Sequence, residues 1–296
     1  MPAQPVILAN AEAGPKSTDI EELADLFGDI ADVRPIGDDL TADVASAVDS
    51  GAPWVGVAGG DGSLRAAAPV LMAARRPLLA IPCGTKNHFA LAVGTGTLEE
   101  ALAAAEDGGS RLVDVGYVGD ELFLNTASFG TYAAVVRERD RREHLPKRVA
   151  DALGVVRQGF GGQRYRVEID GVERRAWEVF AGNGRYGETL RTMNQRDGLD
   201  AGVLDVRLVL AEHKLARARL VVALVASTIG RTPVVERRVV EQVTIGLYGE
   251  DTALVALDGD ALRFRSPMCW RVERAALPVR VPRDQVPVLR SPPSGD

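Results

Sequence analysis

The chain has 296 residues, of which 46% are hydrophobic and 26% are charged, and its formal net charge is −6. This composition is typical of a folded globular protein, and the acidic balance argues against nucleic acid as a partner. The two cysteines exclude a disulfide framework and a four-cysteine zinc site. The sequence shows neither a signal segment nor an apolar run of the roughly 20 residues that span a bilayer, which predicts a cytoplasmic protein.

The first third of the chain predicts strands and helices in alternation. The expected strands cover residues 6–8, 54–58 and 78–81. The expected helices cover residues 18–27, 64–75, 88–93 and 98–106. The last of these begins with a capping box formed by Thr97 and Glu100. Such alternation predicts a parallel sheet with helices on both faces.

Beyond about residue 111 the pattern changes to short strand-like runs. The turn dipeptides Asp170–Gly171 and Asp258–Gly259 separate some of these runs, and helices are expected at 132–159 and 212–230. The sequence therefore predicts an α/β N-terminal domain and a second, β-rich domain of β-sandwich type. We place the first domain at residues 1–115 and the second at 116–296, with the last roughly 20 residues free to return to the first domain.

A glycine-rich loop follows the strand expected at 54–58. It consists of Gly59, Gly60, Asp61, Gly62 and Ser63. Glycines allow a ligand to approach the backbone closely, and the start of the next helix offers N–H groups to an anion such as a phosphate. The Asp61 carboxylate could meet Mg²⁺ or a hydroxyl group. The structural alternative is a tight turn in which Asp61 acts as a cap.

A second loop follows the strand expected at 78–81. It contains Pro82, Cys83, Gly84, Thr85, Lys86 and Asn87. Both loops should lie at the carboxyl edge of one sheet, where open α/β sheets bind ligands. Thr85 and Asn87 can hydrogen-bond a nucleotide, while Lys86 either reaches a phosphate or stays solvated. Together the loops predict a nucleotide-binding site in the first domain.

Six motifs occur in one order along the chain. They are ILANAEAG (7–14), GGDGS (59–63), PCGTKNHFA (82–90), LVDVG with FLNTASFG (112–116 and 123–130), LDAGVLDV (199–206) and VALDGD (255–260). As a set they resemble the catalytic domain of the diacylglycerol kinase family, which includes bacterial lipid kinases and sphingosine kinases. The resemblance covers nearly the whole chain, and the set is specific although each motif alone is weak.

The resemblance implies a two-domain kinase that uses ATP and Mg²⁺. The implied ATP-binding residues are Asn10, Gly59, Gly60, Asp61, Gly62, Ser63, Gly84, Thr85 and Asn87. The implied residues around Mg²⁺ are Asp61, Asp114 and Asp260, with a structural Mg²⁺ at Asp200 and Asp205. The implied catalytic carboxylates are Asp258, Asp260 and Asp61, and the base stays open between Asp258 and Asp61. Phosphoryl transfer depends on such groups because it requires positioning and charge neutralisation.

Several positions depart from the usual family pattern. Asp260 replaces a glutamate and shortens the reach of the carboxylate, whereas Ser63 replaces a threonine and keeps the hydroxyl. Lys86 and His88 replace the commoner glycine and aspartate. Ala201 replaces an acid in the loop implied to hold the structural Mg²⁺, which weakens that site most.

The predicted activity is transfer of the γ-phosphate of ATP to a lipid hydroxyl, with diacylglycerol as the default acceptor. Two alternatives stay open: an NAD kinase-like enzyme, and a non-catalytic nucleotide or lipid sensor of the same fold. The protein would meet its lipid peripherally at a membrane surface, and a homodimer is left open. The basic run Arg137–Arg148 could contact lipid headgroups or form a solvated helix, and the apolar run Leu220–Ile229 could line a lipid pocket or form a core helix.

Overall fold

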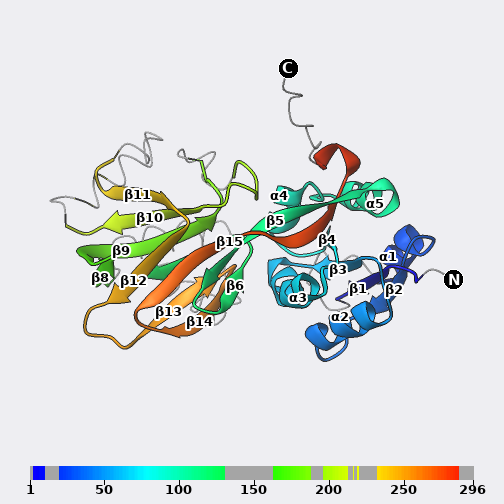
Figure 1. Ribbon diagram of the computed structural model, residues 1–296, viewed down its shortest axis with the longest axis horizontal. Helices are drawn as coiled ribbons and strands as arrows, with labels where there is room; N and C mark the ends of the chain where they lie inside the picture. Colours follow the sequence, from blue (N-terminus) through cyan, green and yellow to red (C-terminus); the bar gives the residue numbers. More distant parts are fainter. Residues whose placement is uncertain are drawn as a thin grey trace, which may run out of the picture. The chain divides into compact units, whose positions relative to one another are not determined.

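The computed structural model describes residues 3–10, 20–130, 163–187, 196–212, 216, 219 and 232–286. It divides into two compact units (Figure 1). The first comprises Met1–Val113 together with Ala275–Asp296, and the second comprises Asp114–Arg274. Two strands contribute to both units, β5 (Gly109–Val118) and β15 (Met268–Val281), so the chain leaves the first unit through β5 and returns to it through β15.

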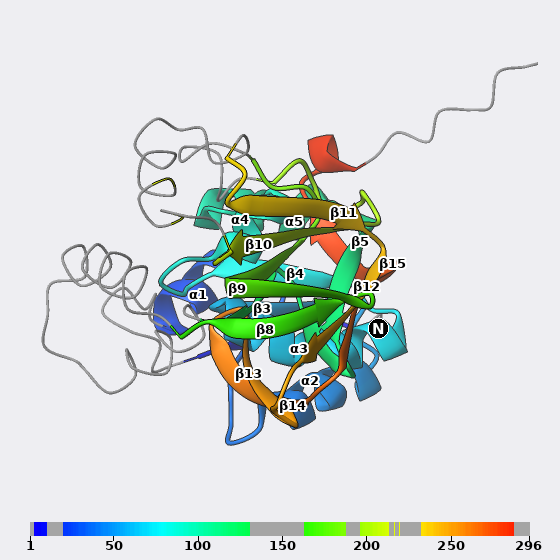
Figure 2. The same ribbon diagram turned by 90° about the vertical axis from the view of Figure 1, so that its left-hand side faces the viewer.

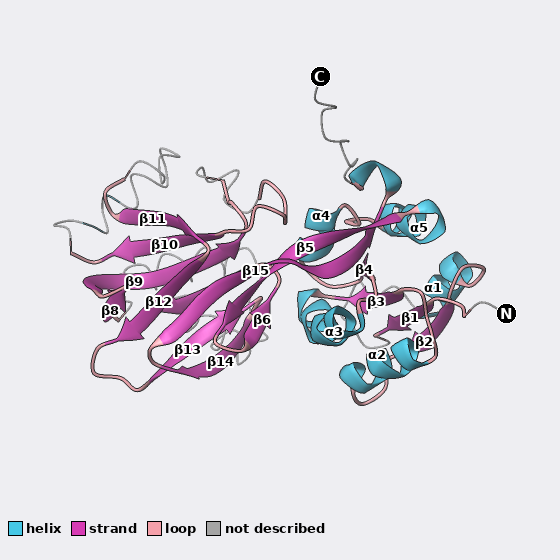
Figure 3. Cartoon of the chain, in the orientation of Figure 1, coloured by secondary structure: helices cyan, strands magenta, loops and turns pink. Residues whose placement is uncertain are grey.

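The first unit is an α/β fold on a parallel sheet. Its further elements are β1 (Val6–Ala9), α1 (Ile20–Phe27), β2 (Asp32–Pro35), α2 (Leu40–Asp49), β3 (Val55–Gly59), α3 (Asp61–Ala74), β4 (Leu78–Pro82), α4 (His88–Val93), α5 (Leu98–Asp107) and a 3₁₀ turn, η2 (Arg283–Gln285). The strand order is β2-β1-β3-β4, and β4 also pairs in parallel with β15. Figure 3 shows these helices in cyan. The α/β architecture predicted for the N-terminal part is confirmed.

Local sequence explains these elements. β1, β3 and β4 are almost wholly buried, and strands buried on both faces read as continuous apolar runs. The predicted capping box is confirmed, because the Thr97 hydroxyl accepts from the Glu100 N–H while the Glu100 carboxylate accepts from the Thr97 N–H. One boundary differs: α3 begins at Asp61 rather than at the predicted Leu64. The end of the glycine-rich loop is therefore already helical.

The second unit is built from strands that pair antiparallel. Besides parts of β5 and β15 it contains β6 (Glu121–Phe123), β7 (Thr126–Gly130), β8 (Tyr165–Ile169), β9 (Val172–Asn183), β10 (Leu204–Leu210), β11 (Val235–Val240), β12 (Gln242–Leu247), β13 (Thr252–Leu257) and β14 (Asp260–Arg265). The long strand β9 pairs with β10, and also with β7 and β8 along successive parts of its length. Figure 2 shows β8, β9, β10 and β11 side by side. The predicted β-rich character is confirmed.

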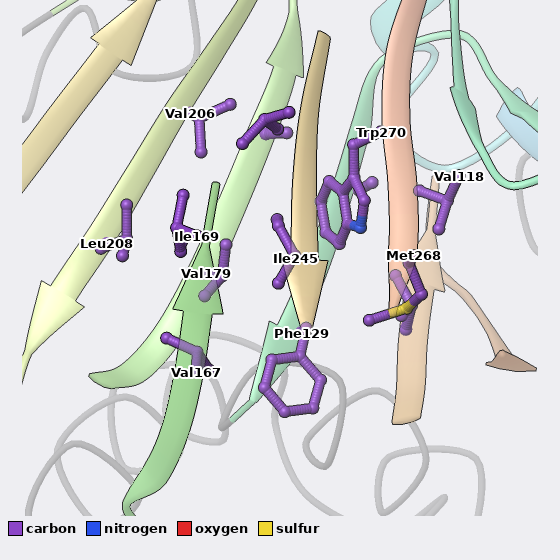
Figure 4. Close-up of a cluster of buried hydrophobic side chains, with 14 of the residues drawn as sticks. Val118, Phe129, Val167, Ile169, Val179, Val206, Leu208, Ile245, Met268 and Trp270 are labelled. Atoms are coloured by element: carbon purple, nitrogen blue, oxygen red, sulfur yellow. The ribbon is translucent and has the colours of Figure 1, made fainter. Parts of the chain in front are cut away.

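An apolar core fills the second unit (Figure 4). Val179, Val206, Ile245 and Trp270 are completely buried, and Phe129 is 3% exposed. Full burial of a side chain of this size stabilises the fold by roughly 1.5–3 kcal/mol. Because side chains alternate across a strand, this core also fixes the register of the pairs. The register in turn sets the positions of the connections that carry the polar residues described below.

The two predicted turn dipeptides are confirmed. Asp170–Gly171 joins β8 to β9, and Asp258–Gly259 joins β13 to β14. Asp170 and Asp258 have φ of 49° and 51°, and the glycines that follow have φ of 80° and 108°. Positive φ at both central residues is the geometry of the tight hairpin turn that Asp-Gly favours.

Several predictions fall on residues outside the described part of the chain. These are the helix expected at 132–159, the basic run Arg137–Arg148, most of the helix expected at 212–230 and the apolar run Leu220–Ile229. Among the helices that the structure describes, none is both long enough and apolar enough to cross a membrane.

Candidate active site

The two glycine-rich loops lie against each other at the carboxyl ends of β3 and β4. Gly59, at the end of β3, pairs with Pro82 at the end of β4. Gly60 is the N-cap of α3, and a Cβ atom added at Gly84 would overlap the Cα atom of Gly60. A residue without a side chain is therefore required at Gly84 for this close approach. The structure brings together the two loops that were predicted to bind ATP.

Asp61 connects the first loop to the second. Its Oδ1 accepts a hydrogen bond of 2.9 Å from the backbone N–H of Phe89, and its Oδ2 accepts one of 3.2 Å from that of His88. His88 and Phe89 are the first residues of α4, so Asp61 caps a helix that lies 27 residues further along the chain. A negative charge at the positive end of a helix is favourable. The capping role that was left open for Asp61 is present, on α4 rather than on its own helix.

Asn87 holds the second loop closed. Its Nδ2 donates to the carbonyl of Gly84 at 3.0 Å, and its Oδ1 accepts from the N–H of Gly84 at 2.9 Å. Asn87 itself has φ of 51°, in the left-handed region that asparagine tolerates better than most residues. Its side chain, predicted to hydrogen-bond a nucleotide, thus shapes the loop. Thr85 and Lys86, between the two bonded residues, are exposed.

The start of α3 is suited to a phosphate group. The N-cap residue of this 14-residue helix is Gly60, which has no side chain to cap it, and Gly62 in the first turn is exposed. An N-terminal turn presents backbone N–H groups and partial positive charge, and the glycines remove Cβ atoms that would keep an anion away. Asn10 follows β1 and donates its backbone N–H to the carbonyl of Ala58 in β3 at 3.2 Å. The residues present therefore fit the phosphates of ATP.

In the second unit, Asp258 binds the connection between β6 and β7. Its carboxylate accepts hydrogen bonds from the backbone N–H groups of Leu124, Asn125 and Thr126, at 2.7, 2.8 and 2.9 Å. Its own N–H donates to the carbonyl of Thr126. Three consecutive amides around one carboxylate make a strong, charge-assisted arrangement. Asp258 thus fixes a loop 132–134 residues away, which the sequence did not reveal.

Asp260 has a different environment. It is the first residue of β14, pairs with Leu257 across the hairpin and is exposed to solvent. Of the two carboxylates in the DGD motif, the second faces water while the first is partly buried against backbone amides. The two acids that were predicted together as catalytic are therefore distinguished by their surroundings.

Further polar residues hydrogen-bond the Leu124–Thr126 loop. Arg196 donates to the carbonyl of Leu124 at 3.0 Å and to the side-chain oxygen of Asn125 at 2.8 Å. Asn183, which is fully buried, donates to the carbonyls of Leu124 and Asp114. The hydroxyl of Tyr186 donates to the carbonyl of Asn125 at 3.0 Å. The sequence analysis assigned no role to Arg196, Asn183 or Tyr186. The one pattern that could have indicated such a role is the polar Asn183 at the end of the apolar strand β9.

The other acids implied to lie near Mg²⁺ are Asp114, expected beside Asp61, and Asp200 and Asp205, expected at a structural ion, and their surroundings differ. Asp114 is buried, and its Oδ2 accepts from the N–H of Gly202 at 2.6 Å. Asp205 is completely buried between Arg207 and Arg237, whereas Asp200 is exposed. Within the described ranges, no three histidine, cysteine, aspartate or glutamate residues form a cluster that could hold a metal ion.

The neighbours of Asp205 lower its pKa. Burial by itself raises the pKa of Asp205, but hydrogen bonds from Arg237, Arg207 and the Tyr186 N–H outweigh it, and the pKa lies below its ordinary value. The carboxylate is therefore charged at neutral pH. An ionised buried carboxylate needs this compensation from charged and hydrogen-bonding neighbours.

The predicted residues gather in two groups, one in each unit. In the first unit, Asp61 contacts the start of α4, and Gly84 contacts Gly60 and Asn87. In the second unit, Asp258 anchors the Leu124–Thr126 loop and Asp114 binds Gly202. Each group consists of backbone segments that are held by one or two acidic side chains.

Comparison with known proteins identifies the family. The family model of the diacylglycerol kinase catalytic domain matches residues 6–118, which include both glycine-rich loops. A protein of Pseudomonas fluorescens strain Pf-5, described as "Probable lipid kinase YegS-like", is 30% identical over 243 residues, which cover 76% of this chain and 76% of the relative. The chain belongs to the diacylglycerol kinase family. A relative of the same description from Pseudomonas aeruginosa strain UCBPP-PA14 is 28% identical over 278 residues, or 86% of this chain and 84% of the relative.

The solved structures agree at the level of the fold. A crystal structure of a diacylglycerol kinase from Bacillus anthracis str. Sterne superposes with a TM-score of 0.63 and 19% identity, covering 96% of this chain and 98% of the other. The resemblance drawn from the motifs is confirmed. As a lipid kinase of this family the protein is a phosphotransferase, and family membership implies the use of ATP. The matches favour this branch over the NAD kinase-like alternative.

Proposed function

We propose that this lipid kinase transfers the γ-phosphate of ATP to the hydroxyl of diacylglycerol and so forms phosphatidic acid. The observation that carries the proposal is the contact between the two glycine-rich loops, which Asp61 ties together through the amides of His88 and Phe89. Catalysis of phosphoryl transfer is mostly positioning and electrostatic stabilisation, and a rigid cradle of backbone amides supplies both. Diacylglycerol is the acceptor named for the matched family and the Bacillus anthracis structure.

Within this proposal, residues of the first unit bind the nucleotide. The N-terminus of α3, from Gly60 to Ser63, receives phosphate oxygens, and the loop from Gly84 to Asn87 lines the same edge of the sheet. When bound, Mg²⁺ would neutralise charge on the phosphates, and Asp61 is the carboxylate of the first unit that we propose to lie near it. Carboxylate oxygens are the ligands that Mg²⁺ prefers among side chains.

The base that receives the proton of the lipid hydroxyl is proposed to be Asp258 or Asp61. Both carboxylates also hold backbone amides in place, so a loss of turnover after mutation does not by itself identify the base. A stability measurement must accompany each activity measurement. Asp260 is exposed and provides the comparison with the partly buried Asp258.

The proposed activity is tested by incubating the purified full chain with labelled ATP, Mg²⁺ and vesicles that contain single lipids. Labelled phosphatidic acid from diacylglycerol vesicles is the expected product. If a total lipid extract yields a different labelled lipid, the acceptor assignment is wrong while the kinase assignment stands. ATP binding without transfer to any lipid or to NAD would instead favour the sensor alternative.

Sedimentation with the vesicles tests the proposed peripheral contact with a membrane surface. Sedimentation of the protein alone at several protein concentrations tests for a homodimer.

A further inference from the structure

Asp205 in β10 lies in a cage of hydrogen-bond donors. Arg237 donates Nε to Oδ1 at 2.8 Å and its terminal nitrogen to Oδ2 at 2.9 Å. Arg207 donates to the same two oxygens at 3.3 and 2.8 Å. The backbone N–H of Tyr186 adds a fifth hydrogen bond, to Oδ2 at 3.0 Å. A carboxylate offers about four lone-pair positions, so both oxygens of Asp205 are fully used.

A divalent cation does not fit beside these donors. Mg²⁺ or Ca²⁺ would have to lie roughly 2.0–2.6 Å from a carboxylate oxygen, within the space that the two guanidinium groups occupy. The side chain is also 0% exposed, so no open side remains for a hydrated ion. The two guanidinium groups bring two positive charges, the same charge as one divalent cation.

The rest of the segment has its own protein partners. The N–H of Gly202 donates to Asp114, and the carbonyl of Gly202 accepts from Arg274 at 3.4 Å. Ala201 supplies no side-chain oxygen, and Asp200 is exposed. The residues around Asp205 therefore do not fit the structural Mg²⁺ that the LDAGVLDV motif implied.

We infer that Arg207 and Arg237 take the place of a structural cation in the β-rich unit. The two arginines bind more than Asp205. Arg207 also donates to the carbonyls of Tyr186 and Gly187, at 2.7 and 3.0 Å, and Arg237 donates to that of Tyr186 at 3.3 Å. The hydroxyl of Tyr186 in turn supports Asn125 in the loop that Asp258 holds. β10 and β11, which carry the two arginines, are direct neighbours in the sheet (Figures 1 and 2).

The inference is tested on the nucleotide-free full chain by thermal unfolding, in EDTA and in excess Mg²⁺. The midpoint should agree within about 1 °C between the two, because no cation is part of the folded β-rich unit. Arg237→Met should lower the midpoint by roughly 10 °C in both solutions, since it leaves a buried carboxylate with incomplete compensation. Arg238→Met is the matched control. Arg238 is the next residue of β11 and binds the partly exposed Glu236, so its loss should shift the midpoint by only about 1–2 °C.

Metal binding measured by calorimetry gives the independent readout. A divalent ion that binds the EDTA-treated wild type, and is lost in Asp205→Asn, overturns the inference. So does a wild-type midpoint that falls in EDTA as far as it falls in Arg237→Met. If Arg237→Met does not fold, Arg237→Lys takes its place. The comparison of the wild-type midpoints in EDTA and in Mg²⁺ still shows whether a cation stabilises the folded protein. None of these outcomes depends on lipid phosphorylation, so the inference and the proposed activity fail separately.

Discussion

Asp61, the acid of the first glycine-rich loop, accepts a hydrogen bond from the backbone N–H of Phe89 in the first turn of α4. The acid thus belongs to the architecture of the nucleotide-binding edge as well as to its proposed chemistry. Asp61→Ala should lower the free energy of unfolding by about 1 kcal/mol, as expected for loss of a helix cap, and should also abolish turnover. Denaturant unfolding and the lipid phosphorylation assay measure the two effects.

The matched control for this prediction is Asp39→Ala. Asp39 caps α2 through the N–H groups of Thr41 and Ala42, so its loss should cost a similar free energy of unfolding. Turnover of the Asp39 variant should stay within a few-fold of wild type. Equal losses of turnover in both variants would show that Asp61 acts only through stability.

Gly84→Ala should separate the two glycine-rich loops. The added Cβ atom would overlap Gly60 Cα and lie 2.8 Å from the Asn87 side-chain oxygen, and overpacking of this kind costs about 1–3 kcal/mol. Gly60→Ala is the informative partner, because a Cβ atom there meets only Gly84 Cα at an ordinary 3.5 Å. Unfolding experiments should therefore find Gly84→Ala clearly less stable than Gly60→Ala. ATP affinity by calorimetry should fall in Gly84→Ala, and unchanged affinity would argue against a nucleotide at this edge.

Asp258→Asn and Asp260→Asn should differ in stability although both should lose turnover. Asparagine tolerates the left-handed backbone of Asp258, but its single oxygen cannot accept all three amides of Leu124, Asn125 and Thr126. We expect about 1–3 kcal/mol of lost stability for Asp258→Asn and a smaller loss for Asp260→Asn, because the Asp260 side chain is exposed. ATP affinity should remain within a few-fold in both. Wild-type turnover in Asp258→Asn would remove it as a candidate for the base.

Acid should weaken the β-rich unit through Asp205. Its pKa is lower in the folded chain than in the unfolded chain, where aspartate titrates at about 3.9. The stabilisation is therefore fully present above the unfolded pKa and is lost as the pH falls toward the lower folded value. Urea unfolding from neutral pH down to below about pH 4 should show this loss. Arg237→Met should have a shallower acid dependence, and an unchanged slope would contradict the role of Arg237.

Sequence patterns predicted most of the first unit for a local reason. Apolar runs at β1, β3 and β4 and the Thr97–Glu100 capping box are properties of a few neighbouring residues, so they can be recognised without the fold. Glycine-rich segments after β3 and β4 also had to meet, because parallel strands end at the same edge of the sheet. The order of the six motifs then led to the kinase family.

The supports of the candidate site were not predictable in this way. Asp258 and Leu124 are separated by 134 residues, and Asp205 and Arg237 by 32. Nothing in the local pattern around Asp205 distinguishes an acid for Mg²⁺ from an acid for arginine, and the motif pointed to the metal. Which partner an acid meets depends on how β10 packs against β9 and β11.

The amino-acid sequence by itself determined the elements of the first unit, the two glycine-rich loops and the family. The periodicity of hydrophobic residues, the turn-forming residues and the order of the motifs can all be recognised from local sequence. Only the tertiary structure decided which groups the acids hold: Asp61 an adjacent helix, Asp258 a distant loop, Asp205 two arginines. The physical reason is that a buried carboxylate must be compensated by whatever donors packing brings to it.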